Sequence, residues 1–301
     1  MSDIALNNKQ KKTKIRRQKI KDFIFLLINH RMGKVGVWVI IFFLFIAFAA
    51  PLLRTVNPHQ SGNATEILIP PDGQFWFGTD DLGRDVWSQV IYGSRISLLI
   101  GFISALATIV TGTLVGIIAG FYGGIIEEVL MRIVDFFMML PALPLMIVLA
   151  AVLGPSIWNI IFVVSLISWP TTARVVRSQI LSLKERPFIE ASRCIGASNS
   201  LLMFGEIFPN VVPILFAEAV IMITEAIYAE AVLSFLGLGD PVRMSWGSML
   251  HFAFDSGVMA RAPWWVLPPI LSIILLIVGF SFLGTAVSDV LKPGYKETKG
   301  L

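Results

Sequence analysis

Six long runs of apolar residues alternate with polar stretches along the chain. The runs cover residues 35–53, 96–122, 125–153, 156–176, 211–234 and 265–287. A helix needs about 20 apolar residues to cross the hydrocarbon core of a bilayer, so each run is long enough to form one span. The pattern therefore predicts an all-α, polytopic membrane protein with six transmembrane helices.

Lysines and arginines are unevenly distributed around these runs. If both termini lie in the cytoplasm, 19 of the 24 basic residues fall on cytoplasmic segments and five on external ones. Membrane proteins carry such an excess on their cytoplasmic segments, so we expect both chain ends inside the cell. Ten of the basic residues precede the first run, where a basic stretch more often fixes orientation than binds nucleic acid. A nucleic-acid partner is therefore not expected.

The first run could belong to a signal peptide, because residues 47–49 resemble a cleavage site. The basic region before it is 34 residues long, and the run exceeds the roughly 7–15 apolar residues of a signal peptide. A retained anchor is the better interpretation. The chain then divides into a basic cytoplasmic segment (1–34), a first helix with an external loop (35–95), a five-span core with a cytoplasmic coupling loop at 182–209 (96–290), and a cytoplasmic tail (291–301).

Composition agrees with a membrane protein and excludes several kinds of chemistry. Charged residues make up 15% of the chain, against about 25% in soluble domains. Cys194 is the only cysteine, so no disulfide can form within the chain, and the three histidines lack metal-ligand spacing. The phosphate-binding motif GxxxxGK[ST] is absent, and no nucleophile–base pair suggests an enzyme. We expect no catalytic residue, metal site or cofactor on this chain.

Small residues recur every four positions along the second run. They are Ser104, Thr108, Gly112, Gly116 and Gly120. Small residues at this spacing let two helix backbones approach closely, although glycine is also simply common in membrane helices. Five in register favour a helix-packing contact centred on the three glycines, with an unknown partner helix.

The third run is charged in its first half and contains prolines near its middle. Glu128, Arg132 and Asp135 are spaced so that they can pair on one helix face. They lie either at the cytoplasmic headgroups, where charge costs less, or in a polar contact with a neighbouring subunit. Pro141 and Pro144 should bend the span.

Three carboxylates, Glu218, Glu225 and Glu230, lie in the fifth run. Carboxylates inside a membrane are costly and often functional. We treat these three as candidates for lining a pathway or contacting another subunit.

Two polar loops contain residues with more than one possible role: the acidic loop before the second run and the loop before the sixth. Asp80, Asp81 and Asp85 could form a metal cage, but an arginine among them makes a poor one. Turns at the neighbouring glycines, with Asp85 capping the next helix, explain the same residues. In the later loop, residues 237–263, tryptophans near the ends are expected to anchor at the headgroups.

The polar segment between the fourth and fifth runs is expected to form two short helices joined at an angle. Pro187 suits a first helical position and Gly196 a helix end. Ser198 or Asn199 can cap a second helix, which Pro209 should stop. Residues 188, 189 and 195 place apolar side chains on or near one face of the first helix. Such an amphipathic elbow is either a docking element or a helix lying on the lipid surface.

This segment resembles the EAA loop of ABC importer permeases, the helix that couples the permease to an ATP-binding subunit. The resemblance rests on Glu190, Ala191 and Ser192, then Gly196, then Phe208 and Pro209, with Ser192 in place of the second alanine. Three further stretches (78–98, 234–239 and 246–249) resemble the C-type permeases of dipeptide, oligopeptide and nickel importers. The similarity extends over about residues 20–295.

The resemblance implies a type I importer permease fold in the cytoplasmic (inner) membrane. It also implies the partners: a second homologous permease, two ATP-binding subunits that carry ATP and Mg²⁺, an external solute-binding protein and the lipid bilayer. The substrate is expected to be a peptide, with nickel and oligosaccharides as alternatives. A secondary transporter or channel that works without ATP is the alternative from another class, but it predicts inverted repeats, which the sequence does not show.

Overall fold

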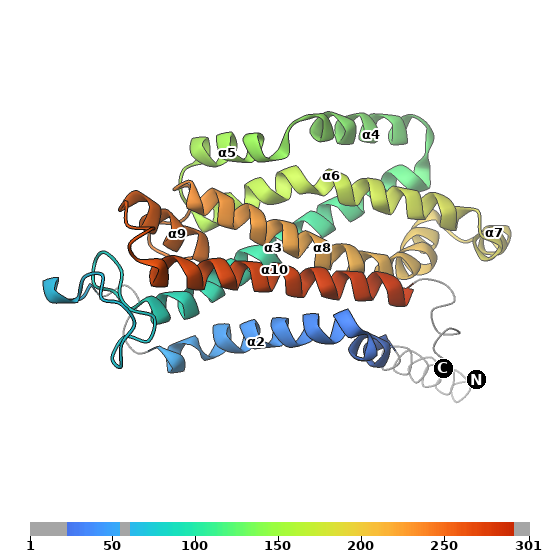
Figure 1. Cartoon of the computed structure of the whole chain (residues 1–301). Coiled ribbons are helices and arrows are strands. Elements are labelled where there is room, and N and C mark those ends of the chain that lie inside the picture. Colours follow the sequence, from blue (N-terminus) through green and yellow to red (C-terminus); the bar gives the residue numbers. More distant parts are fainter. Residues whose placement is uncertain (1–22, 55–60, 292–301) are drawn as a thin grey trace.

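The computed structural model describes residues 23–54 and 61–291, which form a bundle of long helices (Figure 1). The helices in chain order are α2 (Arg31–Leu53), α3 (Val86–Tyr122), α4 (Gly124–Met139), α5 (Ala142–Leu153), α6 (Ile157–Lys184), α7 (Pro187–Cys194), a π-helix (Leu201–Ile207), α8 (Phe208–Phe235), α9 (Trp246–Asp255) and α10 (Pro263–Leu291), with a short 3-10 turn at Ala64–Glu66. Short α7 lies at one end of the bundle and α9 at the other (Figure 1).

Five of these helices are long and apolar enough to cross a membrane: α2, α3, α6, α10, and α8 together with the π-helix before it. The pair α4–α5 passes the same test together and is bent by 88°. These elements correspond to the six predicted spans. Helix α3 starts ten residues before its apolar run, where the Asp85 side chain accepts a hydrogen bond from the backbone N–H of Ser88, so the predicted helix cap is confirmed.

The predicted bend in the third span is a complete break between two helices. Leu140 is extended (ψ 138°) and Pro141 precedes the first residue of α5. A residue before proline is pushed out of the helical region by the proline ring, which explains why α4 ends where it does.

The glycine stripe of α3 lies against α6. A Cβ atom added at Gly116 would lie 2.6 Å from the carbonyl oxygen of Ala173, and one added at Gly112 would lie 2.6 Å from Cβ of Thr172. At Gly120 the same atom would lie 2.7 Å from Cβ of Ile180. The two helices can therefore touch along this line only because the three positions lack side chains.

Ion pairs join α4 to α6 as well. Arg174 Nη2 lies 2.6 Å from Asp135 Oδ1, and the guanidinium of Arg177 donates to Glu127. Of the two pairs expected on α4, the pair of Glu128 with Arg132 is confirmed at 3.7 Å, and the pair of Arg132 with Asp135 is wrong. Asp135 has its partner on the neighbouring helix, which the spacing along one helix cannot indicate.

The later loop contains helix α9, and the expected anchoring of tryptophans at the headgroups is wrong for two of the three, whereas Trp264 is half-buried. Trp246 and Trp265 are fully buried. The Nε1–H of Trp246 donates to the carbonyl of Val90 at 2.9 Å, and its ring packs edge-on against Phe43. Trp246 thus holds α9 against α3 and α2 in the core.

The contact between α3 and α6 predicts that a larger side chain destabilises the protein at Gly116 more than at the neighbouring Val115. Gly116→Leu should lower the stability of the purified protein, because overfilling a packed contact costs about 1–3 kcal/mol. Val115→Leu, at the half-buried neighbour, serves as the matched control. Thermal unfolding in detergent measures the difference, and equal melting temperatures for the two variants would contradict a tight backbone contact.

Candidate functional site

Helix α7 projects from the end of α6 and is fixed to the bundle by one face. Pro187 occupies its first turn, and Ile189 is fully buried. Phe188 and Ile195 are exposed, at 41% and 86%, so of the three apolar side chains expected on or near one face, Ile189 alone is buried. Ile189 instead packs into a cluster with residues of the π-helix and of α6, which are Leu202, Met203, Ile207, Val176 and Ile180.

The end of α7 is set by Gly196, as predicted. This residue has a φ of +83°, a conformation that glycine adopts without the steric cost of a side chain. The N–H of Gly196 bonds to the carbonyl of Arg193, and the N–H of Ala197 bonds to the carbonyl of Ser192. These two bonds satisfy carbonyl groups that the last turn of a helix leaves open.

The second part of the elbow differs from the prediction. Residues Leu201–Ile207 form a π-helix that continues directly into α8 at Phe208. Pro209 does not stop a helix, because the chain remains helical through it from the π-helix into α8. The elbow therefore consists of α7 and a turn that is continuous with a membrane-spanning helix.

Helix α7 lies at the tip of the molecule (Figure 1), and the side chains left outside by this packing form a mixed apolar and charged surface. Its exposed residues include Phe188, Glu190, Ala191, Cys194 and Ile195 together with the basic Arg186 and Arg193, and Ser192 is half-buried. A surface of this kind, held by a buried anchor at Ile189, is suited to docking on another protein.

The three carboxylates of α8 have different surroundings. Glu230 is fully buried and accepts hydrogen bonds from Ser97 Oγ at 3.1 Å and Ser234 Oγ at 2.8 Å. Glu218 is also buried. Glu225 is exposed and lines a pocket of about 500 Å³ between α8 and α10. Of the three, Glu225 is the one on a surface that a pathway or a partner can reach.

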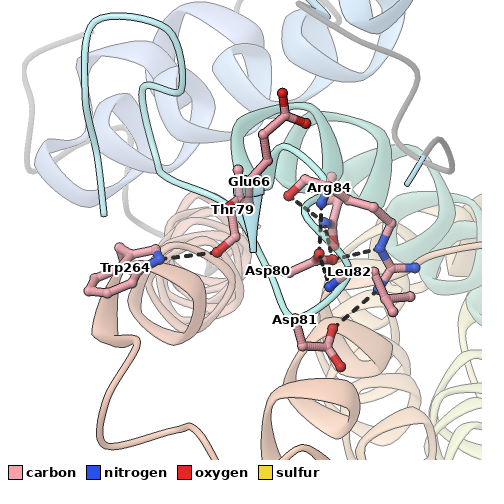
Figure 2. A network of polar contacts seen from close by, with 8 residues as sticks. Glu66, Thr79, Asp80, Asp81, Leu82, Arg84 and Trp264 are labelled. Atoms are coloured by element: carbon pink, nitrogen blue, oxygen red, sulfur yellow. Dashed lines mark hydrogen bonds and ion pairs between the residues drawn. The ribbon is translucent and has the colours of Figure 1, made fainter. Parts of the chain in front are cut away.

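The acidic loop before α3 is organised around Asp80 (Figure 2). Its buried carboxylate accepts bonds from the N–H groups of Leu82 and Arg84, from Arg84 Nε at 2.6 Å and from Gln89 Nε2 at 2.7 Å. Sequence reasoning missed Gln89, because its partner lies nine positions away in another element.

Two tight turns and a hydrogen bond to α10 hold this loop in place. Gly78 and Gly83 have φ values of +68° and +72°, which fits the predicted turns. Trp264 Nε1 donates to the carbonyl of Thr79 and ties the loop to α10 (Figure 2). Burial, and secondarily the charge of Asp80, raises the pKa of Asp81. Among the described residues, no group of three or more His, Cys, Asp or Glu side chains could hold a metal ion.

Comparison with known proteins decides the family. Residues 112–297 match the family described as binding-protein-dependent transport system inner membrane component. The chain belongs to this family. Residues 20–71 additionally match the N-terminal transmembrane domain of oligopeptide transport permease C.

Several curated proteins are similar to this permease over most of their length. The dipeptide transport system permease protein DppC of Alkalihalophilus pseudofirmus is 37% identical, covering 90% of this chain and 88% of the relative. The oligopeptide transport system permease protein OppC of Bacillus subtilis is 33% identical, covering 92% and 90%. DppC of Haemophilus influenzae is 34% identical, covering 92% and 96%.

A solved structure has the same fold. It shows inward-facing conformations of the MetNI methionine ABC transporter and aligns with a TM-score of 0.54 at 20% identity, covering 68% of this permease and 97% of that chain. The family match and the relatives show that the permease is a multi-pass membrane subunit of an ABC transporter, and the alternative of an ATP-independent carrier is set aside.

The Asp80 network predicts a large difference between two neighbouring aspartates. Asp80→Ala should destabilise the protein by about 3–5 kcal/mol, because it removes the close carboxylate partner of the Arg84 guanidinium, whose side chain is 11% exposed. Asp81→Ala should cost about 1 kcal/mol or less. The Asp81 side chain is 33% exposed, and its carboxylate lies 3.9 Å from Arg84. Thermal unfolding in detergent compares the two, and a loss for Asp81→Ala as large as that for Asp80→Ala would disprove the central role of Asp80.

Proposed function

We propose that this permease is one of the two membrane-spanning subunits of an ATP-driven peptide importer. Family membership carries the proposal, together with relatives named as dipeptide and oligopeptide permeases at 33–37% identity over about nine-tenths of the chain. Those names favour peptides over nickel or oligosaccharides. A second homologous permease completes the pathway, two separate subunits bind ATP and Mg²⁺, and an external binding protein delivers the peptide.

The orientation proposed from the charges places α7 in the cytoplasm and α9 outside. The excess of basic residues, 19 against five, supports this assignment. Helix α7 then lies on the side where ATP is available, and the Asp80 loop lies on the side from which peptide arrives.

Glu225 is the proposed pathway or subunit-contact residue. Its carboxylate lies in the middle part of a membrane-spanning helix on the outer surface of the chain. A carboxylate facing lipid at this depth is costly, so the surface around it must meet a water-filled pathway or the second permease. The hydroxyl groups of Thr224, Ser281 and Thr285 line the same pocket and support this interpretation.

The coupling role belongs to the segment from Glu190 to Pro209. Its exposed tip is suited to a cleft in the ATP-binding subunit, and its buried side joins α6 to α8 through Ile189 and the π-helix. Closure of the ATP-binding subunits then moves α7, and the two membrane helices move with it as rigid bodies.

The proposal predicts that two substitutions uncouple the transporter without preventing its assembly. Gly196→Val should misdirect the elbow, because a β-branched residue resists a positive φ at a cost of about 1 kcal/mol or more. Glu190→Lys reverses the charge at one exposed position of α7. Both variants should reach wild-type levels in the membrane, lose peptide uptake, and show ATP hydrolysis that no longer responds to loaded binding protein.

Gly196→Asn is the matched control, since asparagine tolerates a left-handed backbone better than valine and nothing lies within 4 Å of a Cβ atom placed there. It should retain most uptake. Normal transport by both Gly196→Val and Glu190→Lys would show that α7 does not couple the two activities, and a helix lying on the lipid surface would then be the better interpretation.

A further inference from the structure

Two arginines line a pocket at the α9 end of the bundle that the coupling mechanism leaves unused. The pocket has a volume of about 310 Å³. Its lining consists of Tyr92, Arg95, Ile96 and Leu99 from α3, with Arg243 and Met244 from the segment before α9. These residues are far apart in the sequence, so the fold alone brings the two guanidinium groups to one cavity.

Neither guanidinium group is neutralised by an acidic side chain of the described part of the chain. No ion pair involves Arg95 or Arg243 among residues 23–54 and 61–291. Arg95 lies over the ring of Tyr92, 5.7 Å from its centroid. Asp240 instead accepts from the backbone N–H groups of Val242 and Arg243, and so shapes the turn that carries Arg243.

The position of Arg95 places this charge where a solute would enter the membrane region. Arg95 lies in α3, directly before the apolar run that starts at residue 96. Both arginine side chains belong to exposed residues, and two like charges facing one cavity repel each other unless an anion lies between them. Guanidinium groups bind carboxylates through paired, charge-assisted hydrogen bonds.

The rest of the pocket favours an anion that is part of an organic molecule. Ile96, Leu99 and Met244 add an apolar wall to the two charges. One turn further along α3 than Leu99, Phe102 packs edge-on against Phe280 at 5.8 Å between ring centroids. Phe280 in turn lines the pocket that contains Glu225, so this ring contact between α3 and α10 connects the helix that carries Arg95 to the wall of the acidic pocket.

We propose that the Arg95–Arg243 pocket binds the C-terminal carboxylate of the peptide as it enters the pathway. The apolar wall accommodates the side chain next to that carboxylate, and the acidic pocket beyond Phe102 and Phe280 has the charge that suits the ammonium end. This inference rests on the proposed peptide function, and it assigns the two arginines to the transported molecule rather than to the binding protein or to lipid.

The test uses the complete transporter in proteoliposomes with its binding protein, and alanyl-alanine and alanyl-alanine amide as probes. The double variant Arg95→Gln/Arg243→Gln should lower uptake of alanyl-alanine about tenfold or more, the effect of losing a charge-assisted pair. Uptake of the amide, which lacks the carboxylate, should be at most about twofold lower in the double variant than in the wild type, because neutral contacts are weaker. The affinity for loaded binding protein should not change.

Arg261→Gln is the matched control, because Arg261 is also exposed at the α9 end but does not line the pocket; it should transport both probes normally. Equal relative losses for the two probes would overturn the proposal, as would unchanged uptake by the double variant. Weaker docking of the binding protein would reassign the arginines to that partner, and a loss that depends on anionic lipid would reassign them to headgroups. A wild-type transporter that imports neither probe would overturn the proposed peptide function itself, and this inference with it.

Discussion

Backbone contact between α3 and α6 determines how the two ends of this permease are connected. Gly112, Gly116 and Gly120 allow the contact because a Cβ atom added at each of them would lie within 2.7 Å of an α6 atom. Helix α6 leads directly into α7, and α3 leads back to the Asp80 loop and to the wall of the arginine pocket. A displacement of α7 can therefore reach the opposite end of the bundle through two helices that cannot slide apart without losing their packing.

Polar groups within the apolar helices need partners inside the protein, because lipid offers them none. Arg174 and Arg177 of α6 pair with Asp135 and Glu127 of α4, which gives α4 a fixed place beside α6 although the chain breaks after it. Glu230 is satisfied inside the bundle by two serines. Glu225, in contrast, is exposed on the outer surface of α8, and its exposure points to a neighbouring subunit or to water.

Much of this arrangement could be predicted from the sequence, because local rules decide it. Apolar length gives the spans, a carboxylate before a helix gives the Asp85 cap, and glycine at a helix end gives the turn at Gly196. Contacts between distant segments could not be predicted in this way. The burial of Trp246, the partner of Asp135 and the role of Gln89 all depend on which helices become neighbours. Pro209 misled the prediction because proline is compatible with the first turn of a helix as well as with its end.

The central claim is that α7 contacts the ATP-binding subunit on the cytoplasmic side. Cys194 tests it directly, because it is the only cysteine of the chain and is exposed on α7. With single cysteines placed along the cleft of the ATP-binding subunit, a short bifunctional maleimide should link the two subunits in the assembled complex, and should not do so when Cys194 is replaced by serine. Failure to form any such crosslink in an assembled and active complex would contradict the account, as would labelling of Cys194 from the external side of the membrane.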